Sequence, residues 1–292
     1  MTFAWIEERR DEWPVALLCR VLEVSRSGFY AWRSREASDA EVRREELTEE
    51  VQAIHAEVKG RYGRPRIHAE LVDRGHECSA NFVAQVMREA GIAAKTKRKF
   101  RQTTDSNHSL PVAENVLDRE FDPEEPNTSW VADVTYIPTR EGWLYLAVVE
   151  DLFSRKVVGW SMDQTMTSRL VVDALEMALA ARLQGSSSSG LVTHSDRGSQ
   201  YAGEHYQRRL SEERITCSMS RRGNGWDNAP MESFFASLKK ELVHDEDYAT
   251  REQAKASIFE YIEAFYNRIR RHSALGYVAP DEYERTHNQT HR

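Results

Sequence analysis

The chain has 292 residues but only three cysteines, Cys19, Cys78 and Cys217, and they lie far apart. This spacing provides neither a disulfide framework nor a Cys-x-x-Cys metal site, so disulfide-stabilised small folds and zinc knuckles are excluded. A reducing cytoplasm is the compartment expected for such a cysteine content.

Long apolar runs are also missing. No stretch reaches the roughly 18 apolar residues that indicate a membrane-spanning helix, and the N-terminus lacks the basic-then-apolar pattern of a signal peptide. We therefore expect no membrane partner. The length is sufficient for one large hydrophobic core and a smaller unit.

The charge is unevenly distributed along the chain. The formal net charge is −7 at pH 7, which by itself does not favour nucleic-acid binding. Between residues 58 and 101, however, 11 Lys and Arg residues stand against 4 Asp and Glu residues. Because nucleic acid responds to local patches of charge and not to the average, this segment predicts contact with DNA.

Three acidic residues occupy positions that are unfavourable for a carboxylate without a partner. Asp133 lies inside an apolar β-type run (130–137), and Asp196 ends a second one (191–196). Glu232 follows Asp196 with 35 residues in between, on a helix-like segment at 228–241. Burying an acid in a hydrophobic strand is costly unless it is paired or coordinates a metal. Three such acids on separate elements predict a shared cation.

Carboxylates without a His or Cys cluster are suited to hard cations. Mg²⁺ prefers oxygen ligands and keeps several waters, whereas zinc favours His and Cys. Two such cations about 3.5–4 Å apart can activate the attacking oxygen and stabilise the leaving oxygen at a phosphodiester. We therefore expect two Mg²⁺ ions per site, with Mn²⁺ as a substitute, and phosphoryl transfer as the reaction.

Each acid also has a structural interpretation. Asp133 could pair with a buried Arg, Asp196 could serve the turn that follows it, and Glu232 could interact favourably with the dipole of its own helix. Asp151 ends another apolar run, and a role in the adjacent turn is favoured for it.

Longer strings surround the three acids. They are His194-Ser-Asp-Arg-Gly-Ser-Gln-Tyr201, the segment from Gly223 to Glu241 that begins Gly-Asn-Gly-Trp-Asp-Asn-Ala-Pro-Met-Glu, and Tyr266-Asn-Arg-Ile-Arg-Arg-His-Ser-Ala-Leu-Gly-Tyr277. In these strings the chain resembles the DDE transposases, and within them the second-frame (OrfB) product of the bacterial insertion sequences called the IS-three family, relatives of retroviral integrases. The resemblance extends from about Trp5 to Glu284.

The resemblance implies an α/β fold with an RNase H-like catalytic core, a mixed five-stranded sheet flanked by helices, preceded by an all-α helix-turn-helix-like region. Asp133, Asp196 and Glu232 match the three catalytic and metal-binding acids of the family, and Lys239 matches its basic residue seven positions after the Glu. The implied activity is that of a transposase: metal-dependent DNA strand cleavage at the ends of an insertion sequence, followed by strand transfer (DNA integration).

The resemblance also implies the partners. These are double-stranded DNA, as terminal inverted repeats and as target, and further copies of the chain in a homo-oligomeric complex at the nucleoid of a bacterial cytoplasm. In the family, a separate upstream frame supplies a further helix-turn-helix and a leucine zipper through frameshifting. This chain starts at Met1 without a heptad run, so association or fusion with that upstream product is a further expectation.

The patterns along the chain predict four parts. Residues 1–40 hold two short helical patterns of helix-turn-helix size, for which DNA contact and simple packing are equal alternatives. Residues 41–101 form a second, basic helical region, residues 102–126 a polar linker, and residues 127–285 the catalytic core with a C-terminal helix. In the core we expect strands at 129–137, 143–150, 155–163, 191–195 and 215–220, and helices at 168–183, 203–213, 228–241 and 251–271.

Cationic side chains of the second region are the expected DNA contacts. A charged run is more often a solvated face, but here it accompanies a helix-turn-helix shape. The predicted contacts are Arg61, Arg64, Arg66, Lys95, Lys97, Arg98, Lys99 and Arg101, together with Lys239 and Gln200 near the acids.

Several residues near the acids keep two interpretations. Gln200 and Tyr201 could touch substrate or pack, and Trp226 could stack on a base or fill the core. Arg270 and Arg271 could meet DNA or the C-terminus of a helix.

Two other function classes stay open. One is a DNA-binding protein with a silent core, such as a repressor of its own element, which has no need of all three acids. The other is a plain RNase H-like nuclease, which has no need of roughly 100 residues of helical, partly basic sequence before its core. A transposase needs both features.

Overall fold

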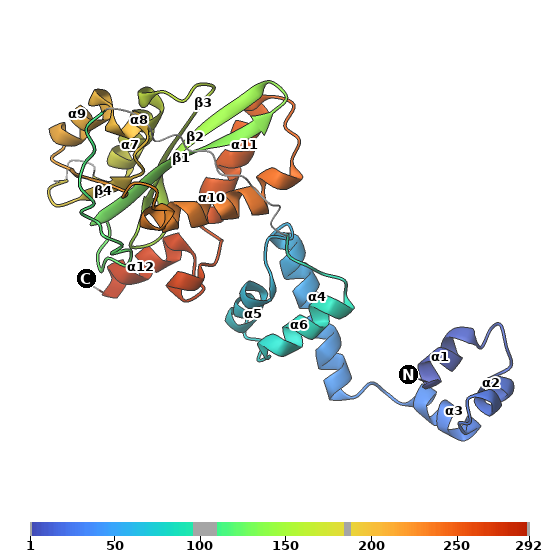
Figure 1. The fold of residues 1–292 in the computed structure, drawn as a ribbon. Coiled ribbons are helices and arrows are strands. Elements are labelled where there is room, and N and C mark those ends of the chain that lie inside the picture. The colour runs from blue at the N-terminus through green and yellow to red at the C-terminus, as the bar shows by residue number, and fades with distance from the viewer. Residues whose placement is uncertain (1, 96–109, 184–187, 291–292) are drawn as a thin grey trace.

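The computed structural model describes residues 2–95, 110–183 and 188–290. They form an elongated molecule in which a small N-terminal helical unit and a second helical unit precede an α/β core (Figure 1). The predicted DNA contacts Lys97, Arg98, Lys99 and Arg101 lie outside the described residues. Among the helices of the described ranges, none is long and apolar enough to cross a membrane.

The N-terminal unit contains three helices, α1 (Thr2–Arg9), α2 (Val15–Val21) and α3 (Arg26–Ser34). The last two were predicted, whereas α1 was not. Ser25 caps α3 by accepting a hydrogen bond from the Gly28 N–H at 3.0 Å. The small core of this unit consists of Ile6, Leu18, Cys19 and Phe29.

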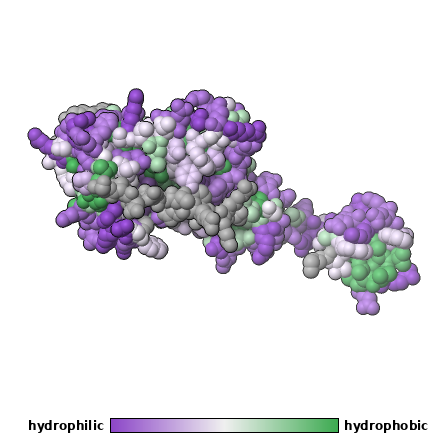
Figure 2. Space-filling view, turned by 45° about the horizontal axis from the view of Figure 1, so that its top comes forward, coloured by the Kyte–Doolittle hydropathy of each residue, from purple (hydrophilic) through white to green (hydrophobic). Residues whose placement is uncertain are grey.

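Large apolar side chains remain on the surface of this unit because so small a core cannot cover them. Figure 2 shows the resulting apolar surface on the unit. The exposed residues are Trp5, Trp13, Leu17, Val21, Tyr30 and Trp32.

The second unit contains α4 (Asp39–Glu57), α5 (Arg64–Asp73) and α6 (Ala80–Glu89). Pro65 lies in the first turn of α5, and Ser79 caps α6 by accepting a hydrogen bond from the Phe82 N–H at 3.1 Å.

The core contains the predicted mixed five-stranded sheet. Its strands are β1 (Ser129–Thr139), β2 (Gly142–Asp151), β3 (Lys156–Asp163), β4 (Val192–Ser195) and β5 (Thr216–Met219). Their order is β3-β2-β1-β4-β5. The first three strands form an antiparallel meander, β4 runs parallel to β1, and β5 runs parallel to β4.

Helices cover both faces of this sheet. Side chains alternate along β1, so Trp130 and Ala132 pack on the side of α7 (Ser168–Arg182), while Val131 packs on the side of α10 (Ala229–Glu241) and α11 (Arg251–Phe259). The remaining helices are α8 (Ser199–Ala202), α9 (Glu204–Glu212) and α12 (Pro280–Thr290).

The C-terminal helix predicted at 251–271 is shorter and less regular than expected. After α11 the chain forms a π-helical segment, Glu260–Tyr266, and the helix ends near Asn267. The Asn267 side chain there bonds both backbone groups of Val157, at 3.0 and 2.9 Å, which turns the chain toward β3. Ile269, which follows this turn, is exposed.

The described part of the predicted linker is packed against the core. Leu117 is buried, and the backbone N–H groups of Val116 and Leu117 donate to the Ser218 hydroxyl at 2.9 and 3.0 Å. Polar composition indicated the absence of regular structure here, but not these contacts.

Glu150 makes stability depend on pH. Its buried carboxyl accepts a hydrogen bond from Tyr266 at 3.1 Å, and burial raises the pKa of Glu150 to about 8. In the unfolded chain a Glu titrates near 4.3, so between these two values unfolding releases a proton and rising pH lowers stability. Glu150→Gln should therefore raise the free energy of unfolding at neutral pH by on the order of 2–3 kcal/mol.

Urea unfolding at mildly acidic and at neutral pH checks this expectation. The gain should shrink toward the unfolded pKa of about 4.3, where both states hold the proton. A gain of the same size at both pH values would show that Glu150 is ionised in the fold.

Candidate active site

Strand register places two of the three acids side by side. In the parallel pair, Ala132 of β1 lies opposite Ser195 of β4. Asp133 directly follows Ala132, and Asp196 directly follows Ser195. Neighbouring strands of a sheet lie about 4.8 Å apart. Since β4 ends at Ser195, the two carboxyl groups lie where the strands begin to separate.

Glu232 approaches from α10, close enough for its charge to act on Asp133. Asp133 shares the sheet face of Val131, two residues earlier, and this face packs against α10. Asn228, directly before the helix, donates from its side chain to the Ala132 carbonyl at 3.4 Å. Its side chain makes no capping hydrogen bond and instead ties the helix to β1. Glu232 lies in the first turn of α10 and is exposed.

Electrostatics link the three acids. The pKa of Asp133 lies well above its ordinary value, first because of burial, then because of the negative charges of Asp196 and Glu232; Lys239 opposes the shift. Negative charge therefore accumulates around Asp133, and a bound cation would relieve it.

The loop after β4 holds Asp196 in position. The Gly198 N–H donates to an Asp196 carboxylate oxygen at 2.8 Å. A Cβ at Gly198 would lie 2.9 Å from that oxygen and 2.9 Å from the Gln200 side-chain oxygen, so only glycine fits there without displacing one of them. Arg197 fixes the loop further by donating to the Ser220 carbonyl at 2.7 Å. Gln200 is thus close to Asp196, and its contact with DNA stays a prediction.

Lys239 lies close enough to Asp133 for the two opposite charges to interact. Its half-buried ammonium is 5.2 Å from the centre of the Tyr136 ring. Burial lowers the pKa of Lys239, and the Asp133 carboxylate counteracts this. Helical side chains lean toward the N-terminus of their helix, which directs Lys239 back toward the turn that carries Glu232.

The donor set fits a hard divalent cation. In the described part of the chain, no three acidic, His or Cys side chains lie close enough to form a ready-made metal cage. Mg²⁺ is usually held by one or two carboxylates together with waters and substrate phosphate, so the chemistry of oxygen donors such as these suits it. Asp133 and Asp196 could hold such an ion from the sheet, with Glu232 from α10.

Asp227 is a residue whose role the sequence patterns did not indicate. Its buried carboxylate accepts hydrogen bonds from Arg221 at 2.7 Å, Arg119 at 2.8 Å and Asn115 at 3.2 Å. Arg221 first, then Arg119, hold the pKa of Asp227 far below its ordinary value. This network fixes the turn directly before α10. The neighbouring Trp226 is 77% exposed, so its interpretation as a core residue is wrong.

Tyr201 and Asp151 have structural roles. Tyr201 is buried and packs edge-on against Tyr206, with ring centres 5.2 Å apart. Asp151 pairs with Arg182 at 2.9 Å and accepts a hydrogen bond from the Phe153 N–H at 3.1 Å. The turn interpretation of Asp151 is therefore confirmed.

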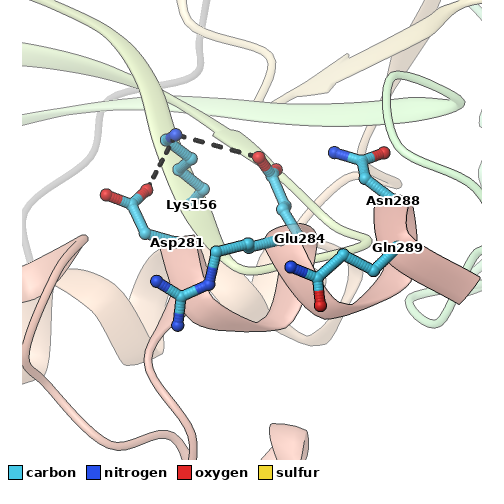
Figure 3. A pocket seen from close by; sticks show the side chains of 6 residues that line it. Lys156, Asp281, Glu284, Asn288 and Gln289 are labelled. Atoms are coloured by element: carbon cyan, nitrogen blue, oxygen red, sulfur yellow. Dashed lines mark ion pairs between the residues drawn. The ribbon is translucent and has the colours of Figure 1, made fainter.

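A polar pocket beside α12 is separate from the three acids. Lys156 pairs there with Asp281 at 2.8 Å and with Glu284 at 3.7 Å (Figure 3). Glu284 also accepts hydrogen bonds from Ser154 at 2.6 Å and Arg182 at 2.8 Å. Because these charges compensate one another, we interpret the pocket as part of the interface that holds α12 against the core.

Arg61 is placed differently from the prediction. It is 7% exposed, and its guanidinium lies 4.3 Å from the centre of the Phe265 ring and 5.3 Å from that of Tyr261. DNA could reach this side chain only if it left the interface with the core, so the predicted contact is not supported for Arg61. Arg64, at the start of α5, is exposed and stays a candidate.

Arg66 and Lys95 also make contacts within the chain. Arg66 donates to the Arg271 carbonyl at 2.8 Å and pairs with Glu241 at 3.3 Å. Lys95 donates to the Glu241 carbonyl at 3.1 Å and pairs with Asp245 at 2.9 Å. Both residues join the second helical unit to the core, and a contact with DNA stays a prediction for them.

Arg270 and Arg271 form ion pairs within the chain that the earlier interpretations did not include. Arg270 is buried against Glu241 at 2.8 Å, and Arg271 pairs with Glu70 at 2.7 Å and Asp73 at 2.6 Å. The sequence could not indicate these partners, since Glu70 and Asp73 belong to the other unit.

Known domain families match most of the chain. Models of an integrase core domain match residues 123–225 and 232–288, and a model of an HTH-like domain matches residues 42–100. Together with the sheet, these matches define a protein with an integrase-type core and a helical region before it.

Relatives narrow the class to one family. The chain is 43% identical over 286 residues to the transposase InsF for insertion sequence IS3A of Escherichia coli (strain K12). This match covers 97% of the present chain and 98% of the InsF protein. It is also 43% identical over 272 residues to the 31 kDa protein of insertion element IS600 from Shigella sonnei, over 93% of this chain and 99% of that one. The chain belongs to the family of IS3 transposases.

Solved structures with similarity to the chain include viral integrases. The simian T-cell lymphotropic virus intasome matches at 15% identity and a TM-score of 0.42, over 76% of this chain and 70% of that one. The catalytic core domain of BIV integrase matches at 19% identity and a TM-score of 0.41, over 57% of this chain and 99% of that one.

Proposed function

We propose that this transposase cleaves DNA at the ends of its insertion sequence and joins them to target DNA, with Asp133, Asp196 and Glu232 as catalytic residues. The observation that carries the proposal is the register of β1 and β4. It supports the proposal because Asp133 and Asp196 directly follow paired residues of neighbouring strands, and Glu232 lies in the first turn of α10, which packs on the face of Asp133.

Two divalent cations, Mg²⁺ or in its place Mn²⁺, would activate the attacking oxygen and stabilise the leaving oxygen. Asp133 and Asp196 would hold them from the sheet and Glu232 from the helix. Gly198 and Asn228 keep these elements in place through the hydrogen bonds described above.

Each reaction step exchanges one phosphorus–oxygen bond for another. In cleavage, a water oxygen bonds to phosphorus while the bond to the 3′ oxygen breaks, which leaves a 3′-hydroxyl and a 5′-phosphate. In strand transfer, that 3′-hydroxyl oxygen attacks a target phosphodiester, and the 3′ oxygen of the target strand departs. Water and DNA hydroxyl are thus alternative nucleophiles at one site.

DNA would contact both the site and the helical units. Arg64 and the basic segment that includes Lys97, Arg98, Lys99 and Arg101 are the proposed contacts of the second unit, and Gln200 and Lys239 those of the core. Further proposals are a homo-oligomeric DNA complex and association with an upstream-frame product.

A cleavage assay tests the function. Labelled duplex DNA with the end sequence of the encoding element is incubated with the full chain, with and without Mg²⁺. We expect metal-dependent cleavage at the element boundary that leaves a 3′-hydroxyl. Binding without cleavage would favour the repressor, and cleavage without preference for the end would favour a plain nuclease.

Lys239 should contribute through its charge. Lys239→Ala is expected to weaken end binding and slow cleavage by about tenfold, as for loss of a charged hydrogen bond to phosphate, whereas Lys239→Arg should retain most activity. Lys240→Ala is the matched control, because the next residue of a helix points about 100° away. Equal, negligible losses for both Ala variants would leave Lys239 without a role.

A further inference from the structure

An exposed tryptophan lies on a firmly held hairpin at the end of the strand that carries Asp133. Trp143 is 50% exposed and follows the tight turn between β1 and β2. Arg251 donates to the Trp143 carbonyl at 3.1 Å and to the Glu141 carbonyl at 2.7 Å, and the Arg140 N–H donates to the Tyr248 carbonyl at 2.9 Å. The indole therefore meets solvent on a backbone that is fixed from α11.

Trp143 connects to the acids through two further side chains. Its ring meets that of Tyr136 edge-on, with centres 4.8 Å apart and an angle of 74° between the planes. On Tyr136 lies the ammonium of Lys239, 5.2 Å from the ring centre. Lys239 is in turn attracted by Asp133. We call Tyr136, Trp143 and Lys239 the aromatic ledge.

The aromatic ledge follows a stretch of β1 that extends beyond its partner. β4 pairs with β1 only as far as Ala132, whereas β1 continues to Thr139. Asp133 stands at the beginning of this stretch and Tyr136 within it. Strand alternation puts Asp133 on the α10 side of the sheet and Tyr136 on the other side, and Lys239 of α10 joins the two at the edge of β1 beyond its last pair with β4, because its ammonium lies over the Tyr136 ring. A polymer bound at the acids and crossing this edge would meet Lys239 and Tyr136 first and Trp143 next.

We propose that the aromatic ledge binds one unpaired nucleotide of the DNA strand that enters the active site. The Trp143 ring would stack on the base, and the Lys239 ammonium would contact the adjoining phosphate. An unpaired base is required because an indole can cover the face of a base only where no neighbouring base does. The proposal rests on the proposed function, which places DNA at the acids.

The chemistry of the aromatic ledge favours nucleic acid as its ligand. Aromatic rings combined with cations are the usual platform for single-stranded nucleic acid, and each stacked base contributes enough to be measured by alanine substitution. A fixed ring also loses little freedom on binding, which favours a pre-formed contact.

The test uses 2-aminopurine, whose fluorescence falls when it stacks on an aromatic ring. Full-length protein carrying Asp133→Asn is mixed, without divalent metal, with duplexes that bear the element's end sequence and a short single-stranded tail. One tail position at a time carries 2-aminopurine. We expect one position to be quenched on binding, Trp143→Ala to remove this quenching and weaken binding about tenfold, and Trp143→Phe to keep most of both.

Two controls make the outcome specific. Phe259→Ala removes an equally exposed ring from α11. Phe259 packs against Trp160 of β3, the edge strand of the sheet, so this variant should change neither the quenching nor the affinity. Trp143→Leu keeps an apolar contact with Tyr136 but cannot stack, and should behave like Trp143→Ala. Binding is measured without catalysis, so a failure of the proposed strand transfer does not affect the result. Unchanged quenching and affinity in folded Trp143→Ala would overturn the proposal.

Discussion

Asp133→Asn, Asp196→Asn and Glu232→Gln should each abolish Mg²⁺-dependent cleavage of end DNA while DNA binding is retained. Each substitution removes a negative oxygen ligand but keeps the shape of the side chain. Because metal ions supply several kcal/mol of transition-state stabilisation, loss of a ligand is expected to slow cleavage by at least about a hundredfold. Cleavage rate and DNA affinity are measured on the same preparations.

The matched control is Asp163→Asn, the same change at the end of β3, the strand at the opposite edge of the sheet from β4 and β5. It should cleave like the wild type. Asp133→Asn should also fold at least as stably as the wild type without metal, since Asp133 is buried among like charges. A variant that retains near wild-type cleavage removes its residue from the site.

Glu241→Ala should destabilise the core by about 3–5 kcal/mol, the usual cost of leaving a buried charge unpaired. Glu241 ends α10, the helix that begins near Glu232, and is 3% exposed. It pairs with buried Arg270 at 2.8 Å and accepts a hydrogen bond from the Tyr261 hydroxyl at 2.9 Å. Removing the carboxylate leaves the Arg270 guanidinium in the interior without its partner.

Urea unfolding of the full chain measures this loss. Arg140→Ala is the control, because Arg140 pairs with Asp247 at the surface, where both side chains are largely exposed. Surface pairs of this kind contribute about 0–1 kcal/mol. If Glu241→Ala cost no more than Arg140→Ala, the buried pair would not hold the end of α10.

The helical unit next to the core meets α10 at this same residue. Arg66 and Lys95 both bond to Glu241, one through its carboxylate and the other through its carbonyl. The helix that carries Glu232 is therefore fixed at its start by Asn228 and at its end by contacts from two parts of the chain. This explains why a charged residue occupies a buried position there.

Local patterns were sufficient to predict the sheet and the three acids. Apolar runs interrupted by turn residues gave the five strands, and a carboxylate inside such a run stood out because its burial requires a partner. The longer strings then placed Glu232 with Asp133 and Asp196. Strand register, which brings the first two together, follows from the fold and is not visible in either strand alone.

Contacts between distant segments could not be predicted. Arg61 was read as a DNA contact because its neighbours in sequence are basic, but Tyr261 and Phe265 cover it from the other end of the chain. The pairing of Arg270 with Glu241 could not be predicted from sequence spacing either. The ring contact of Tyr136 with Trp143, and the place of Lys239 above it, depend on side-chain directions that spacing does not determine.

The most direct test of the account is the joining of end DNA to a plasmid. Labelled duplex with the element's end sequence, supercoiled plasmid and Mg²⁺ are incubated with wild-type protein, with Asp133→Asn, and with wild-type protein and DNA whose terminal 3′-hydroxyl is replaced by hydrogen. We predict covalent transfer of label to the plasmid only in the first reaction. Joining by Asp133→Asn, or joining without the 3′-hydroxyl, would contradict the account.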